Sequence, residues 1–216
     1  MSDIRLHCFC QSGNAYKVAL FLQCAGISWE PVFVDFMKAG VTRDPDWRSA
    51  NNELGEVPVL EIDGKSLSQS GAILMYLSEK TGKFATDGLD QRTEALRWIL
   101  FDNHKFTSYF ATHRFMRSFS PRPQSADVLA FLKGRAESAL SIVDGHLKGR
   151  RFMLGDMPTI ADFSLVGYMF YPTEETGIDL AASYPNIHAW TDRVKGLPGW
   201  VGPYDLMPGD RIAPRQ

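Results

Sequence analysis

The stretch CFCQSGNAYKVAL, residues 8–20, changes from a strand pattern to a helix pattern within a few positions. Polar residues 11–14 separate the two patterns, and Ser12 stands where a helix cap is expected. A helix N-terminus presents unpaired N–H groups and about half a positive charge. Ser12 therefore has two interpretations: it only caps the helix, or its hydroxyl also donates to an anion bound at this corner.

Around this corner, the first eighty residues alternate between strand and helix patterns. Pro31 indicates that the second strand bends or lies at the edge of a sheet, and Asp63-Gly64 is a favoured tight-turn pair. The expected elements are a strand over 4–10, a helix over 15–25, a strand over 28–36, a hairpin over 57–68 and a helix over 68–82.

From residue 82 onward the apolar residues recur mainly with helical spacing. Pro185 suits the first turn of a helix and Gly196 suits its end. Helices are expected within 89–119, 125–147, 157–171 and 184–200. The sequence thus predicts an α/β domain over 1–81, a linker over 82–87 and an all-helical domain over 88–216.

Composition limits the classes of function. The net charge of −2 gives no broad positive field for nucleic acid or an anionic membrane. No apolar run approaches the roughly 18–20 residues that span a bilayer, and the start resembles no signal peptide, so we expect a cytoplasmic protein. The three cysteines form no C-x-x-C or zinc-type spacing, which indicates neither a dithiol centre nor a metal site.

A second unusual feature is GEVPVL, residues 55–60, where a proline precedes a core strand. Proline removes a donor from the strand ladder. A cis Val57-Pro58 bond would turn the backbone groups of Val57 outward, where a peptide-like ligand could pair with them as an added strand. The alternative is an edge strand that tolerates a proline.

A third feature is SQSGA, residues 68–72, where a strand again enters a helix through small polar residues. The N–H and hydroxyl of Ser70 could hold a carboxylate, and Gln69 could donate to the same ligand. Capping alone would also explain these residues. Two helix N-termini and one exposed strand edge in a single small domain together indicate a site for an anionic peptide.

The order of these elements, with VP before the third strand, resembles the thioredoxin fold. Together with the helical half, the chain resembles the cytosolic-type (bacterial) glutathione S-transferase family. The matching pieces are SGNAYKVALFLQCAGI, NELGEVPVLEIDG, SQSGAILMYL and PTIADFSL. The resemblance implies a thioredoxin-like domain, an all-α domain that forms the electrophile pocket and part of a dimer interface, and glutathione as co-substrate.

The resemblance also implies roles for residues of the first domain. Val57 would pair with the cysteinyl part of glutathione next to a cis Pro58. Gln69 and Ser70 would hold the γ-glutamyl carboxylate, with Glu56 beside them. A cation from the irregular segment should hold the glycine carboxylate; Lys38 is our site candidate, with Arg43 and Arg48 as alternatives.

In the second domain, the resemblance implies that Thr159 and Asp162 form a structural helix cap, which is also a plausible capping box. Asp102 interrupts an apolar stripe, and we hypothesise that it reaches the glutathione amine of a neighbouring subunit in a homodimer. The electrophile is expected between the domains, against Phe106, Tyr109, Phe110 and His113; core or dimer packing would equally explain these four.

The thiol-activating group is expected at the corner. Ser12 matches the serine-type members of the family, and Asn14 is a second candidate. Cys10 shares a face with the apolar strand residues, so we interpret it as a small buried residue. A hydrogen bond to a thiolate is worth roughly 1.5–3 kcal/mol, which lowers a thiol pKa of ~8.5 by about one to two units.

The resemblance therefore implies a transferase that conjugates glutathione to a small hydrophobic electrophile. Two alternatives stay open: a glutathione-dependent disulfide reductase or peroxidase, and a non-catalytic ligand-binding stress protein. The identity of the electrophile is not indicated by the sequence.

Overall fold

The computed structural model describes residues 4–215, which divide into two compact units. The first unit contains the described residues up to Lys83 together with Pro198–Arg211. The second contains Phe84–Leu197 and the described residues from Ile212. The sequence predicts a single helical domain over 88–216, whereas Pro198–Arg211 groups with the α/β unit. Among residues 4–215, no helix has the length and apolar character needed to cross a membrane.

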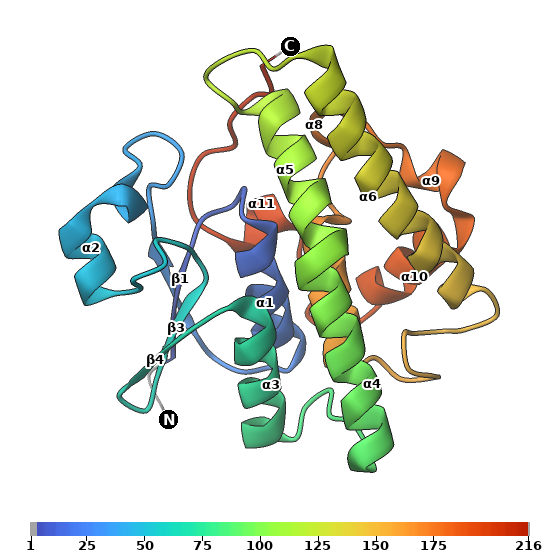
Figure 1. Ribbon diagram of the computed structural model, residues 1–216. Coiled ribbons are helices and arrows are strands. Elements are labelled where there is room, and N and C mark those ends of the chain that lie inside the picture. Colours follow the sequence, from blue (N-terminus) through green and yellow to red (C-terminus); the bar gives the residue numbers. More distant parts are fainter. Residues whose placement is uncertain (1–3, 216) are drawn as a thin grey trace. The chain divides into compact units, whose positions relative to one another are not determined.

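The first unit has the thioredoxin-like arrangement, a four-stranded mixed sheet in the order β2-β1-β3-β4. β1 pairs parallel with β2 and antiparallel with β3, and β3 pairs antiparallel with β4. Helices α1 and α3 pack together on one face of the sheet (Figure 1). The elements are β1 Arg5–Cys8, α1 Gly13–Cys24, β2 Glu30–Phe33, η1 Val41–Arg43, α2 Pro45–Ala50, β3 Val59–Ile62, β4 Lys65–Ser68, α3 Ser70–Thr81 and α11 Pro203–Leu206.

Local signals in the sequence explain most of this unit. β2 is an edge strand, as its proline indicates, and Pro31 lies opposite Leu6. The hairpin turns at Asp63 and Gly64, both with positive φ (50° and 72°), as a type I′ turn requires. The short α2 helix was not predicted, because its six residues carry too little periodicity to be recognised.

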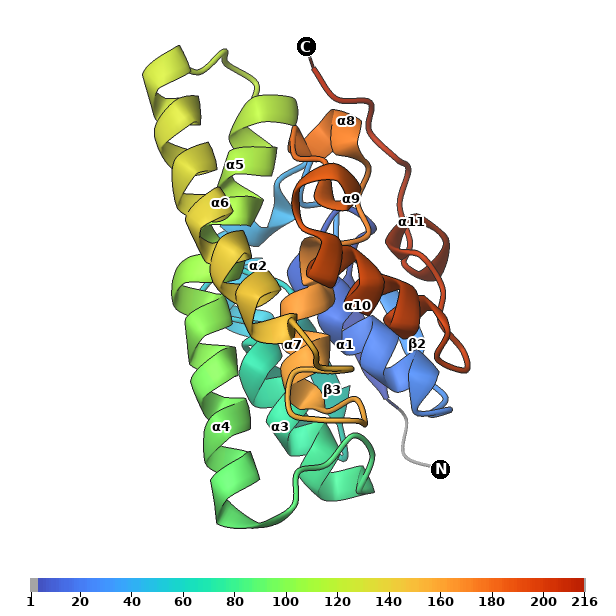
Figure 2. The ribbon, with the colours of Figure 1, turned by 90° about the vertical axis from the view of Figure 1, so that its right-hand side faces the viewer.

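In the helical unit, α4, η2 and α5 form one continuous helix that contains a π-helical stretch, and α6 packs beside α5 (Figure 2). Ser125 caps α6 by accepting from Val128 N–H at 3.3 Å. The apolar residues that recur with helical spacing in α6 are buried, except for Val128, which is 43% exposed; the buried ones are Leu132, Ala136, Leu140, Val143 and Leu147. The elements are α4 Gly88–Phe101, η2 Asp102–Phe106, α5 Thr107–Ser118, α6 Ala126–Leu147, α7 Ile160–Leu165, η3 Val166–Tyr168, α8 Thr173–Thr176, α9 Leu180–Ser183 and α10 Pro185–Lys195.

The N-terminus of α7 is built on a buried carboxylate. Thr159 and Asp162 form the expected capping box, in which the Thr159 N–H donates to Asp162 at 2.9 Å. Asp162 also accepts from Met153 N–H and from the Trp190 indole, each at 2.9 Å. Burial raises the pKa of the Asp162 carboxyl to about 6, and these donors oppose that rise. One side chain thus ties three segments of the helical unit together.

Asp162→Ala is expected to destabilise the protein by about 3 kcal/mol or more, because it leaves several buried donors without an acceptor. Urea unfolding followed by circular dichroism measures the change. Asp156→Ala is the matched control, since Asp156 is an exposed aspartate six positions earlier. Equal unfolding free energies for the two variants would contradict this account of the cap.

Candidate functional site

The corner between β1 and α1 is a tight turn that places Ser12 at the N-terminus of α1. The Ser12 N–H donates to the Phe9 carbonyl at 2.9 Å, which closes the turn. The Ser12 Oγ accepts from Ala15 N–H at 3.2 Å. Within residues 4–215 the Ser12 hydroxyl hydrogen has no acceptor. The two interpretations of Ser12 are therefore compatible, since the oxygen caps the helix while the hydrogen is available to a ligand.

The other two candidates at the corner differ in accessibility. Asn14 is half-buried in the first turn of α1, and in the described part of the chain its amide makes no hydrogen bond. Cys10 is fully buried, and its thiol donates to the Gly209 carbonyl at 3.3 Å. This confirms Cys10 as a small buried residue. Burial raises the pKa of the neighbouring Cys8 thiol to about 12, and Cys10 contributes to the rise.

The Val57-Pro58 bond is cis, as the resemblance implied. β3 begins at Val59, which lies opposite His7 on one side and Ser68 on the other. In residues 4–215, neither the N–H nor the C=O of Val57 makes a hydrogen bond. An extended peptide ligand could therefore pair with Val57 as an additional strand.

Next to Val57, the structure brings Glu56, Gln69 and Ser70 together. The Gln69 amide donates to the Glu56 carboxylate at 3.0 Å. Ser70 is the first residue of α3, is largely buried, and its hydroxyl has no partner within the described residues. A hydroxyl donor and a helix N-terminus can together hold a carboxylate, while Glu56 can accept from an ammonium group.

Sequence reasoning missed the residue that supports this cluster. Asn52 is buried, and its amide nitrogen donates to the Glu56 carbonyl at 2.9 Å. The Asn52 Oδ1 also accepts from Leu54 N–H at 3.1 Å. The side chain thus fixes the loop that leads to Val57. Asn51 and Asn52, followed by Gly55, indicate a loop in the sequence. They do not indicate which of the two side chains turns inward.

The three candidate cations are placed differently. Lys38 Nζ lies 3.2 Å from the Asp210 carboxylate, and both side chains are exposed. Arg48 Nε donates to the Thr42 carbonyl at 3.0 Å, so its guanidinium supports the loop itself. Arg43 is exposed at the end of η1. Lys38 is linked to the corner through Asp210, and its role as the carboxylate ligand stays a prediction.

The hypothesis for Asp102 does not fit the structure. Asp102 is fully buried, and its carboxylate accepts from Thr107 at 2.5 Å and from Ser164 at 2.7 Å. A carboxylate enclosed in this way cannot extend from the surface to a ligand of a neighbouring subunit. Asp102 instead connects the π-helical stretch to α7 inside the helical unit.

The aromatic candidates pack largely into the interior. Phe106, Phe110 and His113 are buried, and the Phe110 ring lies 6.2 Å from that of Tyr168. Tyr109 is half-buried beneath the guanidinium of Arg135, which lies 4.9 Å from the ring centre. Burial favours the core interpretation of Phe106, Phe110 and His113, and the pocket role of all four residues stays a prediction.

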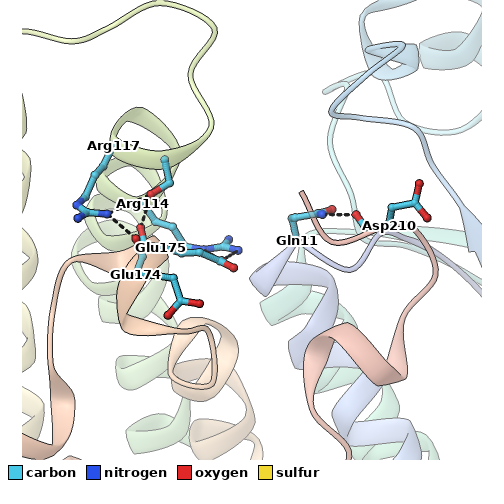
Figure 3. A network of polar contacts seen from close by, with 7 residues as sticks. Gln11, Arg114, Arg117, Glu174, Glu175 and Asp210 are labelled. Atoms are coloured by element: carbon cyan, nitrogen blue, oxygen red, sulfur yellow. Dashed lines mark hydrogen bonds and ion pairs between the residues drawn. The ribbon is translucent and has the colours of Figure 1, made fainter. Parts of the chain in front are cut away.

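A buried ion pair in the helical unit was not predicted. The Arg114 guanidinium lies 2.6 Å from the Glu175 carboxylate and 3.8 Å from the Tyr171 ring centre. Arg117 donates to the Glu174 carbonyl at 2.6 Å (Figure 3). These bonds tie α5 to α8. No sequence signal pairs residues 61 positions apart, so only the fold reveals them.

Comparison with known proteins gives one family over both units. Residues 2–79 match the model of the glutathione S-transferase N-terminal domain, and residues 104–198 match that of the C-terminal domain. Maleylacetoacetate isomerase of Rhizobium meliloti is 32% identical, over 82% of this chain and 84% of the relative. The disulfide-bond oxidoreductase YfcG of Escherichia coli is 26% identical, over 88% of this chain and 89% of the relative.

The same agreement holds for solved structures. A possible glutathione S-transferase from Rhodopseudomonas palustris has a TM-score of 0.85 and 32% identity, over 95% of this chain and 99% of that one. Ure2p in complex with glutathione has a TM-score of 0.80 at 23% identity, which indicates a shared fold alone. The resemblance stated from the sequence is thereby confirmed.

Gln69 offers a test that separates ligand binding from stability. Its φ of 68° lies in the left-handed region, which strains a residue other than glycine. Gln69→Gly should therefore be more stable than Gln69→Ala by about 1 kcal/mol, because both lose the side chain but only glycine relieves the strain. The resemblance implies that Gln69 holds a carboxylate of glutathione, so both variants are expected to bind glutathione about tenfold more weakly or worse, for loss of one hydrogen bond to a charged group.

Urea unfolding and calorimetric titration with glutathione measure the two effects of the Gln69 variants. Wild-type affinity in either variant would exclude the Gln69 side chain from the ligand site. Equal stability of the two variants would show that the strain is relieved elsewhere in the fold.

The buried imidazole of His113 should make the stability of the protein depend on pH. Neither ring nitrogen makes a hydrogen bond of ordinary geometry within residues 4–215. Burial lowers the pKa of the imidazole below its usual range, and Arg117 and Lys133 lower it further. The unfolded chain then takes up a proton first as the pH falls below ~6.5, so stability is complete above that pH and is lost below it.

His113→Leu should remove this loss, up to about 1.4 kcal/mol per pH unit between pH 6.5 and 5 relative to the wild type. Urea unfolding at a series of pH values measures it. His188→Leu, at an exposed histidine of α10, is the control. Parallel pH profiles for the wild type and His113→Leu would mean that the fold accommodates the charged imidazole.

Proposed function

Because the chain belongs to the glutathione S-transferase family, we propose that it binds glutathione in the α/β unit, ionises the thiol by hydrogen bonding to Ser12, and conjugates the thiolate to a hydrophobic electrophile. The observation that carries the proposal is the Ser12 hydroxyl. Its oxygen is committed to the helix cap, and its hydrogen is available at the positive end of α1.

Glutathione would lie across Val57 and Ser70, whose contact groups make no hydrogen bond within residues 4–215, and beside the Gln69–Glu56 pair. Its cysteinyl amide would pair with the backbone of Val57. Its γ-glutamyl carboxylate would accept from the N-terminus and hydroxyl of Ser70, with Gln69 as a further donor. Glu56 would accept from the ammonium group at the same end. Lys38 is proposed for the glycine carboxylate.

The chemical step needs a donor and no added base. Donation from Ser12 stabilises the thiolate by roughly 1.5–3 kcal/mol, which lowers the thiol pKa by about one to two units. The thiol proton leaves to solvent, and Ser12 keeps its own. The thiolate then attacks the electrophilic carbon, forming a C–S bond as the leaving group departs or the adduct takes up a proton. Asn14 is proposed as a second donor at the same corner.

A second candidate is glutathione-dependent disulfide reduction, favoured by the relative named as a disulfide-bond oxidoreductase. The thiolate would attack one sulfur of a disulfide and release the other as a thiolate, and a second glutathione would resolve the mixed disulfide. Buried Cys10 is poorly placed to act as the nucleophile, so this chemistry would also proceed through the bound glutathione. We further propose, from the family alone, a cytoplasmic homodimer with a role in detoxification.

Ser12→Ala should return the pKa of bound glutathione from about 6.5–7.5 to about 8.5. Thiolate absorbance in the ultraviolet, followed against pH at saturating glutathione, measures this. Ser125→Ala is the matched control, because Ser125 also caps a helix through an i+3 N–H and its loss should cost only about 0.5–2 kcal/mol of stability. A bound thiol with unshifted pKa in the wild type would indicate a non-catalytic glutathione-binding protein.

Cys10→Ser separates the two enzymatic candidates. Serine can still donate to the Gly209 carbonyl, so the corner should keep its geometry. We expect the variant to retain, within about twofold, both conjugation of an aryl halide and reduction of a small disulfide. Selective loss of the reductase activity would make Cys10 a redox residue and would overturn its assignment as a packing residue.

A further inference from the structure

Three successive backbone carbonyls near the C-terminus accept hydrogen bonds from the Ser12 corner. We call Pro208–Asp210 the strap. The Cys10 N–H donates to the Pro208 carbonyl at 2.9 Å, and the Cys10 thiol donates to that of Gly209 at 3.3 Å. The Gln11 amide donates to the Asp210 carbonyl at 2.6 Å, as the right side of Figure 3 shows.

The donors are the two central residues of the turn that ends at Ser12. Cys10 and Gln11 lie between Phe9 and Ser12, whose own hydrogen bond closes the turn. The strap therefore holds both residues that set the direction of the chain into α1. It does so from a position 199 residues away in the sequence.

The strap approaches the corner too closely for a side chain. Gly209 has a φ of 108°, and a Cβ at this position would lie 2.8 Å from the Phe33 ring and 3.6 Å from the Cys10 sulfur. Glycine is thus required mainly by the backbone conformation, because the Phe33 ring is 53% exposed and can move aside from a small side chain. Any larger residue must displace the strap, the Phe33 ring or the corner.

The chain that leads into the strap is itself anchored to α1. The Tyr16 hydroxyl donates to the Val201 carbonyl at 2.8 Å, α11 packs against α1, and Met207 is buried. Beyond the strap carbonyls, the Asp210–Lys38 ion pair is exposed and contributes little. The position of the strap is thus fixed by backbone hydrogen bonds and buried contacts, and not by this exposed ion pair.

We propose that the strap is a positioning element for thiol activation, with Gln11 and Gly209 as positioning residues that hold the Ser12 hydroxyl toward the ligand sulfur. The proposal rests on the proposed function of Ser12 as donor. Hydrogen bonds weaken steeply as their angle departs from linearity, so a turn that is free to rotate would donate poorly even with Ser12 intact. The strap supplies the fixed direction that a surface turn lacks.

The test uses Gly209→Ala and Gly209→Val in the full-length protein. Gly26→Ala is the control, because Gly26 also has a positive φ (68°) in the same unit but a Cβ there meets nothing within 4 Å. Alkylation of Cys10 by iodoacetamide without ligand, assigned by peptide mass spectrometry, reports whether the strap still covers the turn. The pKa of bound glutathione reports on Ser12, and the affinity for S-hexylglutathione, whose sulfur carries no thiol, reports on the rest of the site.

We expect the Gly209 variants to raise the alkylation rate of Cys10 by about tenfold or more through local opening, and to raise the pKa of bound glutathione by about one unit. Affinity for S-hexylglutathione should stay within about twofold of the wild type, because its main contacts lie at Val57 and Ser70. Gly26→Ala should leave all three values unchanged, although its own backbone strain lowers stability.

Two results would overturn the proposal. Unchanged Cys10 alkylation in both Gly209 variants would show that the strap does not hold the turn. Faster alkylation with an unshifted pKa of bound glutathione would make the strap a packing element only. An unshifted thiol in the wild-type protein is a different result, because it refutes the function of Ser12, and the positioning role with it, while the alkylation rates still report on the contact.

Discussion

The proposed chemistry depends on one hydroxyl that makes two kinds of contact at once. A serine at a helix N-terminus usually satisfies the helix and nothing else. Ser12 accepts from Ala15 N–H through its oxygen, which leaves its hydrogen to donate. Capping fixes where the oxygen lies, so the donor is preorganised before any ligand arrives. A donor that is already oriented need not be reorganised when the thiolate forms, which is the general condition for electrostatic catalysis.

The same division is found elsewhere in the α/β unit. Side chains that support the site are hydrogen-bonded within the protein, whereas groups that would contact a ligand are not bonded within the described residues. Asn52 bonds to two backbone groups of the loop, whereas neither backbone group of Val57 makes a bond within residues 4–215. Gln69 adopts a strained backbone conformation immediately before Ser70, whose hydroxyl has no partner among the residues that the structure describes. Strain and unpaired polar groups cluster at functional sites because the ligand or the surrounding fold compensates for them. Their coincidence around one cluster supports a ligand site more strongly than any single residue does.

The parts that sequence could predict are those set by local rules. The Asp63-Gly64 hairpin, the edge position of Pro31 and the Asp162 cap each follow from one or two residues and their neighbours. The hypothesis for Asp102 was wrong for a different reason. Asp102 lies seven residues after Ala95 and four after Trp98, so a regular helix already places it on the buried face. The sequence did not show that the hydroxyls of Thr107 and Ser164 would meet the carboxylate there, and Ser164 lies 62 positions away.

The strap could not be predicted for a different reason. Its three contacts join residues 10 and 11 to residues 208–210, and both ends consist of short irregular segments without periodicity. Two of the three donors are a thiol and an amide, which in a sequence indicate chemistry as readily as they indicate structure. Cys10 lies two residues before Ser12, where a cysteine could equally indicate redox chemistry; the fold uses its thiol as a donor to the Gly209 carbonyl. A reactive-looking residue beside an active centre can therefore serve to hold that centre in place, and only its hydrogen-bond partner distinguishes the two roles.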